Sequence, residues 1–266
     1  MTELDVGDLR AVFDEQLRGM VPNRRPEGVH VELEGPLTCF FGTEGRGFVD
    51  YRDLGGLEGA ELDELIACCI DRYAARGERF EWKTFGHDRP ADLAQRLVAA
   101  GFAPEERETV VIASVATIAA EPQVPDGVGL REVTARADLD RIATLEAAVW
   151  DDDRSRLAEM LEGELVADPH ALAIVVAEAD AAVVCAAWVR YAEGTDFASL
   201  WGRATLPAWR RRGIYRATVA YRARLAAGRG FRYLVVDASD DSRPILERLG
   251  FVAVTTTTPY LWSPPT

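Results

Sequence analysis

The sequence predicts an α/β protein made of two related units in tandem. Short apolar runs alternate with longer stretches whose apolar residues recur every three to four positions, a pattern typical of strands interleaved with helices. Segments 77–102 and 228–251 share one order of features: a glycine, an aromatic-rich strand, a polar turn, a helix with a proline near its start, and a terminal Gly-Phe. Their separation of about 150 residues is the size of a domain and favours duplication over a solenoid, with a chance match as the alternative.

The stretch EPQVPDGVG (121–129) separates the two units. It places two prolines and two glycines between patterned segments, which is typical of a linker. We therefore expect a first domain over residues 1–120 and a second over residues 127–266.

The apolar periods predict the elements of both domains. In the first domain we expect a helix, two strands and a second helix, then a strand, a helix and a strand; the first four lie over 6–20, 29–35, 36–42 and 60–75. In the second domain we expect a strand, two helices and three strands over 128–133, 139–149, 154–167, 171–179, 182–191 and 197–205. A loop, a helix, a strand (231–238), a short helix and a strand (251–262) complete it.

The formal net charge of −14 excludes some classes of partner. Nucleic acid and anionic membranes need a broad basic face to displace counterions, so neither is expected to bind. The chain shows no basic and apolar leader and no run of about 18 apolar residues, so we expect a cytoplasmic protein. The four cysteines match neither a disulfide framework nor zinc-ligand spacing, and we expect them to be reduced and in or near the core: Cys39, Cys68, Cys69 and Cys185. No metal site is predicted.

The stretch ATLPAWRRRGIYRA (204–217) sets three arginines and a glycine between a strand and a helix. The first N–H groups of a helix have no acceptor within it, and the helix dipole places partial positive charge there. Gly213 allows a close backbone approach, and Arg210, Arg211 and Arg212 can add charge-assisted hydrogen bonds to phosphate oxygens. The loop therefore predicts a phosphate or pyrophosphate site. The alternative is that the arginines pair with the protein's own carboxylates.

This loop, together with Leu-Gly-Phe at 249–251, resembles the GNAT superfamily of acyl-CoA-dependent N-acyltransferases. Arg210, Gly213 and Tyr215 fall on the three signature positions, although the family has a small residue at the third. The resemblance covers residues 127–262 and implies a mixed, mostly antiparallel central sheet flanked by helices. Residues 1–120 look like a degenerate copy of the same fold that lacks the arginine-glycine loop.

The resemblance also implies acetyl-CoA as the co-substrate. Backbone groups of Ala204, Thr205 and Leu206 would run alongside the pantetheine, and amides of 211–216 would hold the pyrophosphate. The implied cofactor-binding residues are Ala204, Thr205, Leu206, Arg210, Arg211, Arg212, Gly213, Ile214, Tyr215, Arg216 and Ser239.

For the catalytic residues, this chain departs from the family pattern. Attack of an alkylamine on a thioester needs a route for proton removal, an oxyanion donor and a proton for the thiolate. Many relatives carry a tyrosine where this chain has Leu246, an asparagine where it has Ser239, and some a glutamate at Ser199. The remaining candidates are Glu146 and Asp151, near a predicted helix–helix junction, and Tyr191 as a hydroxyl donor. As alternatives, acids at this junction can cap a helix, and Tyr191 can pack in the core or line the cleft. The tryptophans can line an acceptor pocket, but we expect each to pack in the core: Trp150, Trp188 and Trp201.

These residues are consistent with two functions. The first is an N-acetyltransferase that passes an acetyl group from acetyl-CoA to a primary amine, of a small molecule, by direct attack in a ternary complex. The second is a non-catalytic acyl-CoA-binding sensor or interaction protein. A homodimer is a further expectation if a strand edge is exposed between the domains.

Overall fold

The structure is a computed structural model that describes residues 5–42 and 46–265. The first half of the chain contains α1 (Val6–Gln16), β1 (His30–Glu34), β2 (Leu37–Phe41), β3 (Gly47–Asp50), α2 (Gly59–Ala74), β4 (Phe80–Phe85), α3 (Leu93–Ala99), β5 (Ala103–Pro104), β6 (Glu108–Ser114) and α4 (Val115–Ile118).

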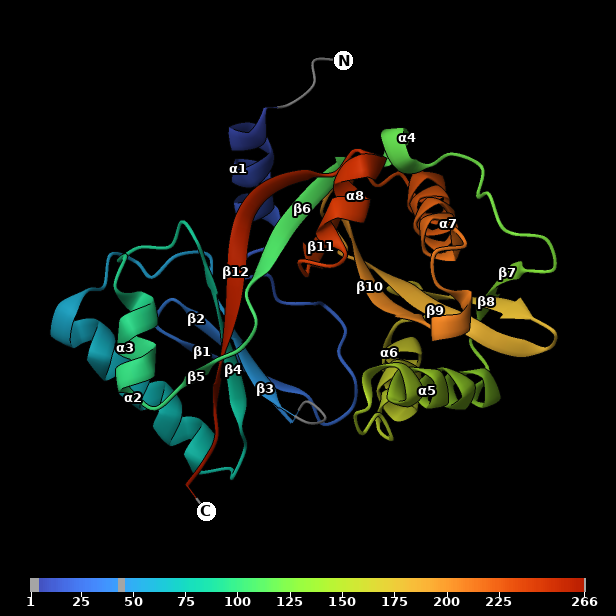
Figure 1. Ribbon diagram of the computed structural model, residues 1–266. Coiled ribbons are helices and arrows are strands. Elements are labelled where there is room, and N and C mark those ends of the chain that lie inside the picture. Colours follow the sequence, from blue (N-terminus) through green and yellow to red (C-terminus); the bar gives the residue numbers. More distant parts are fainter. Residues whose placement is uncertain (1–4, 43–45, 266) are drawn as a thin grey trace.

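The second half follows a segment without helix or strand, from residue 119 to residue 128 (Figure 1). It contains β7 (Gly129–Val133), α5 (Arg136–Trp150), α6 (Leu157–Ala167), β8 (Leu172–Ala179), β9 (Ala182–Tyr191), β10 (Phe197–Thr205), the 3-10 helix η1 (Pro207–Trp209), α7 (Ile214–Gly228), β11 (Tyr233–Ala238), α8 (Arg243–Leu249) and β12 (Val252–Trp262).

Most predicted elements are confirmed, and the strands over 182–191 and 197–205 have the predicted ends. The first helix ends at Gln16, earlier than predicted, because the chain turns at Gly19, whose φ of 70° is left-handed. Strand β3 is missing from the prediction because four residues are too few to show a period.

The described strands form one mixed sheet that is continuous from one half to the other. The sheet has 12 strands in the order β1-β2-β3-β4-β12-β6-β11-β10-β9-β8-β7, with β5 paired to β12 outside this path. Among the described strands, β12 and β6 pair with each other in the middle of this path and join the two halves, so the two ends of the path are β1 and β7. We expected a homodimer only if a strand edge were exposed between the domains. That position is filled by β12 and β6, so the expectation of an exposed edge there is wrong.

Each half of the sheet is completed by the last strand of the other half. Strand β6, from the first half, pairs antiparallel with β11, and β12, from the second half, pairs antiparallel with β4. Figure 1 shows β12 running from the second half into the first beside β6. The halves also repeat a unit, because β3 and β4 are parallel and joined by α2, as β10 and β11 are parallel and joined by α7.

Helices cover both faces of the sheet. On one face, α7 and α8 pack through Val219 and Leu246 in a cluster with Leu234. On the other face, α5 and α6 pack in a cluster with Trp188, and α1 packs through Phe13 in a cluster with Phe197. The sheet is therefore the middle layer of a three-layer protein.

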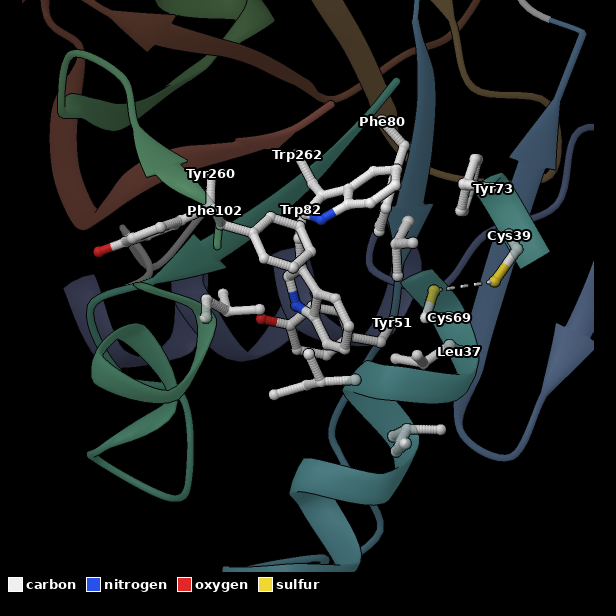
Figure 2. Close-up of a cluster of buried hydrophobic side chains, with 14 of the residues drawn as sticks. Leu37, Cys39, Tyr51, Cys69, Tyr73, Phe80, Trp82, Phe102, Tyr260 and Trp262 are labelled. Atoms are coloured by element: carbon white, nitrogen blue, oxygen red, sulfur yellow. Dashed lines mark hydrogen bonds between the residues drawn. The ribbon is translucent and has the colours of Figure 1, made fainter. Parts of the chain in front are cut away.

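The core of the first half lies between β4 and the helices α2 and α3. Trp82, Phe80 and Tyr73 are fully buried there, and Tyr73 stacks on Phe80 with ring centroids 3.9 Å apart (Figure 2). Figure 2 also shows Cys39 and Cys69 pointing toward one another, with 3.8 Å between their sulfur atoms. All four cysteines are free, but Cys68 is exposed, so the expectation that every cysteine lies in or near the core is wrong for this residue.

Candidate active site

The candidate site begins where two parallel strands separate. Strands β10 and β11 pair at only three positions, of which the last joins Ser199 to Val235. Beyond this pair, β10 continues to Thr205 and pairs only with β9, while β11 continues to Ala238 and pairs with β6. We call the space between the two strands beyond Ser199 the opening. It leaves one backbone edge of β10 without a strand partner.

A bulge at Gly202 shapes this part of β10. The register between β10 and β9 shifts between Trp201 and Ala204, and Gly202 has a φ of 65°. A Cβ atom at Gly202 would lie 2.4 Å from the ring of Trp188. Glycine is required here for both backbone and space, and the bulge turns the end of β10 away from β11.

The arginine loop, residues 206–213, joins β10 to α7. Arg210 donates from Nε to the carbonyl oxygen of Thr205 over 3.0 Å, which ties the loop back to the end of the strand. Arg211 has a φ of 61° and Gly213 a φ of 86°. Alternating left-handed residues turn successive N–H groups toward one side and form an anion-binding concavity.

The start of α7 offers further donors. The first hydrogen bond of the helix joins the N–H of Ala217 to the carbonyl oxygen of Gly213 over 3.0 Å. The N–H groups ahead of Ala217 therefore have no acceptor within the helix. No atom lies within 4 Å of a Cβ built on Gly213, so the side of the loop at Gly213 is open.

The positive charges of the arginine loop, and of Arg216 in the first turn of α7, are not neutralised by carboxylates among the described residues. Arg210, Arg211, Arg212 and Arg216 are exposed, and no ion pair among the described residues involves any of them. Arg212 stacks on Trp209, with its guanidinium carbon 4.8 Å from the ring centroid. The alternative that these arginines serve the protein's own carboxylates therefore has no support in the described residues. The donor set, with cations and free helix N–H groups, fits a pyrophosphate.

Arg222 is a structural residue that no sequence motif singled out. It is buried on α7 and donates from Nη1 to the carbonyl oxygens of Trp188 and Trp201, each over 3.0 Å, and from Nε to Thr218. Burial lowers the pKa of its guanidinium below the ordinary value. The arginine thus fastens α7 to β9 and β10 beside the bulge.

The structure does not bring the three catalytic candidates together. Glu146 is buried on α5 and accepts from Nε1 of Trp150 over 2.7 Å, and Asp151 is exposed at the end of the same helix. Tyr191 lies on the opposite face of the sheet, in the cluster that packs against α7. Burial raises the pKa of Tyr191 to about 12, so this hydroxyl keeps its proton at neutral pH.

The residues that depart from the family pattern have structural roles. Leu246 is fully buried in the cluster with Leu234 and Phe251, and its side chain has no acidic proton to donate to a thiolate. Ser239 lies in the turn before α8, where its oxygen is 3.2 Å from that of Ser242. Ser199 accepts from Nε1 of Trp201 over 2.8 Å. Of the three tryptophans, only Trp188 is buried, while Trp150 and Trp201 are 42% and 45% exposed, so core packing as their common role is wrong.

The first half has a loop in the same topological position, residues 51–58 between β3 and α2, which no motif in the sequence marks as a counterpart. A cavity of about 670 Å³ lies beside it and is lined by Arg18, Tyr51, His87 and Asp88 among others. Arg18 and Asp88 pair with each other over 2.6 Å, so these charges are internally compensated. The arginines of the arginine loop in the second half, by contrast, form no ion pair with a described carboxylate.

The described residues provide no further cofactor or membrane signal. No group of three or more His, Cys, Asp or Glu residues among them is arranged to hold a metal ion. None of the helices in the described ranges has the length and apolar character needed to cross a membrane.

Comparison with known proteins agrees with the fold. Residues 137–251 match the acetyltransferase (GNAT) family. No curated protein matches the sequence.

Solved structures resemble nearly the whole chain. A GCN5-related N-acetyltransferase from Kribbella flavida is 17% identical with a TM-score of 0.70, covering 90% of this chain and 91% of that one. A tandem GNAT protein from the clavulanic acid biosynthesis pathway is 14% identical with a TM-score of 0.63, covering 99% and 98%. A GCN5-related N-acetyltransferase from Sphaerobacter thermophilus is 14% identical with a TM-score of 0.58, covering 87% and 82%. At these identities the likeness shows the fold.

The separated strands and the arginine loop lie within the residues that match this family, whose members are acyl-CoA-dependent N-acyltransferases. The second half of this chain carries a GNAT acetyltransferase domain over residues 137–251.

Proposed function

We propose that this protein transfers an acetyl group from acetyl-CoA to a primary amine of a small molecule, by direct attack in a ternary complex. The observation that carries the proposal is the arginine loop, whose exposed arginines have no carboxylate partner among the described residues. Amides of 211–216 and the side chains of Arg211, Arg212 and Arg216 would bind the pyrophosphate. The pantetheine would lie along the open edge of β10 at Ala204, Thr205 and Leu206.

The reaction has a simple balance. The C–S bond of the thioester breaks, and a C–N bond forms between the acetyl carbon and the amine. A protonated amine loses two protons in total, of which one ends on the thiol of CoA and the other is released to solvent. A free thiol has a pKa of about 8.5, so the thiolate can leave without a dedicated acid at the position of Leu246.

Glu146 and Asp151 remain the proposed proton acceptors on the face covered by α5 and α6. Asp151 is exposed and can exchange protons with water. Tyr191 remains a proposed hydroxyl donor. Because its raised pKa keeps the hydroxyl protonated, Tyr191 can donate a hydrogen bond but cannot take a proton from an amine.

We also propose that residues 1–120 and 127–266 are duplicated units and that the first is a degenerate GNAT-like copy. The repeated β-α-β arrangement of parallel strands supports this division. A cytoplasmic location and a homodimer stay predictions.

A thiol-release assay with acetyl-CoA and a panel of amines tests the function. We expect thiol release that depends on a primary amine, with the N-acetylated amine detected by mass spectrometry. Binding of CoA without release for any amine of the panel would instead identify a non-catalytic acyl-CoA-binding protein.

A further inference from the structure

Asp237 lies on β11 at the edge of the opening. It comes two residues after Val235, the last residue of β11 that pairs with β10. Successive side chains of a strand point to opposite faces, so Asp237 shares a face with Val235 and with its partner Ser199. This is the face covered by α1, α5 and α6, because Val235 packs in the cluster with Phe13 of α1.

An ammonium group already occupies the carboxylate of Asp237. Nζ of Lys83 lies 2.9 Å from Oδ2 of Asp237, and 3.9 Å from Oε1 of Glu81. Both side chains of the close pair are about three-quarters buried, at 26% and 27% exposed. Lys83 is thus a primary amine held beside the opening by a carboxylate.

Lys83 belongs to the first half of the chain. In the sheet order, β12 and β6 lie between β4 and β11, so a contact between side chains of β4 and β11 requires the sheet to curl strongly. The register of β12 against β6 shifts between Ala253 and Thr255, and such a bulge bends a strand. The first half therefore reaches across the concave face of the sheet to the opening of the second half.

The surroundings favour positive charge at this place. Burial alone would lower the pKa of Lys83, but the charges of Asp237 and Glu81 outweigh it and hold the pKa above its ordinary value. A small aliphatic amine is protonated at neutral pH and carries the same ammonium group as lysine.

We propose that Asp237 is the residue that binds the ammonium group of the acceptor amine, and that Lys83 occupies this carboxylate until the acceptor displaces it. The assignment rests on the proposed function and names its acceptor as a protonated aliphatic primary amine. Lys83 is then a competitor supplied by the first half, and Asp237 determines specificity by charge.

Three variants of the full chain test the assignment in the thiol-release assay. Asp237→Asn removes the charge and keeps the shape, Lys83→Met removes the competitor, and Asp71→Asn changes an exposed aspartate on α2 as the matched control. The probes are butylamine and cadaverine, which are protonated at neutral pH, and aniline, which is neutral.

We expect Asp237→Asn to raise KM for the two protonated amines at least tenfold, with KM for acetyl-CoA and for aniline unchanged. Lys83→Met should lower KM for the protonated amines, because it removes the competitor for Asp237. If Asp237→Asn does not fold, this variant tests the assignment instead, and an unchanged KM would contradict it. Asp71→Asn behaves as the wild type.

If the wild type is active and Asp237→Asn has the same KM values as Asp71→Asn, the assignment of Asp237 is overturned. The proposed function would not be affected by this result. Equal rises of KM for butylamine and aniline would also overturn it, because they would indicate a loss of structure rather than of charge recognition. A wild type that releases no thiol with any of the three amines would contradict the proposed function and the assignment with it.

Discussion

The guanidinium group of Arg222 donates hydrogen bonds to the carbonyl oxygens of Trp188 and Trp201, each over 3.0 Å. One side chain thus connects α7, which begins at the arginine loop, with two neighbouring strands beside the bulge. A buried charge is tolerated here because backbone oxygens replace the water that it loses.

Removal of this side chain should destabilise the fold. Arg222→Ala leaves buried carbonyl groups without a donor, and we expect the free energy of unfolding to fall by about 3 kcal/mol. Urea denaturation measures the change. Arg224→Ala is the matched control, because Arg224 is about half exposed and pairs at the surface with Glu121, and it should cost less than about 1 kcal/mol. Equal losses in the two variants would show that the buried contacts contribute nothing.

Gly202 should not tolerate a side chain. Its added Cβ would lie 2.4 Å from the ring of Trp188, and we expect Gly202→Ala to lower stability by about 3 kcal/mol through overpacking and a left-handed φ. Gly194→Ala shares the left-handed φ, at 78°, but nothing lies within 4 Å of its Cβ. The control should therefore cost only about 1 kcal/mol in thermal unfolding. A Gly202→Ala protein as stable as this control would mean that Trp188 moves without cost.

Gly213 should matter for binding rather than for packing. A β-branched residue resists a φ of 86°, so Gly213→Val should shift the loop and weaken acetyl-CoA binding at least tenfold. Gly230→Val is the control, since Gly230 has a φ of 83° and open space at the far end of α7. Calorimetric titration compares the two variants, and the same affinity in both would contradict the role of the loop conformation.

The stability of the protein should depend on pH through Asp50. Burial raises the pKa of Asp50 from 3.8 to about 6, against the opposing effect of hydrogen bonds from the N–H groups of Gly19 and Tyr51. The folded form therefore holds a proton that the unfolded form has lost, and stability falls as pH rises from about 4 to about 6, by up to about 3 kcal/mol. Asp50→Asn stays neutral throughout. Its stability relative to the wild type should rise over this interval in denaturation curves, whereas a constant difference would refute the pKa shift.

The sequence indicates much of the fold because its apolar periods are regular. Strands β9 and β10 are apolar runs of nine or ten residues, and the arginine loop is marked by three adjacent arginines and a glycine. The exchange of β6 and β12 has no local signal. Each is the last strand of its half and could complete either half, so only the packing of the whole sheet decides their partners.

The part of the site that lies within one stretch of sequence could be predicted. The part that the fold brings together from distant residues could not. The arginine loop lies within 14 residues of sequence, 204–217, whereas Lys83 and Asp237 are 154 residues apart. From the sequence alone, Asp237 would be interpreted as the polar end of a strand. Lys83, between Trp82 and Thr84, would be interpreted as an exposed residue. Their contact depends on the curl of the sheet, which no residue pattern specifies.

The most direct test of acetyl-CoA binding at the arginine loop is a calorimetric titration of acetyl-CoA into the wild type and into the double variant Arg211→Glu with Arg212→Glu. Each arginine that meets a phosphate contributes about 1.5–3 kcal/mol, so the double variant should bind at least about 100-fold more weakly while keeping its fold. Arg10→Glu with Arg107→Glu reverses two exposed arginines elsewhere and changes the net charge equally, and it should bind as the wild type does. Unchanged affinity in the loop variant, or no binding to the wild type, would contradict the assignment of the arginine loop.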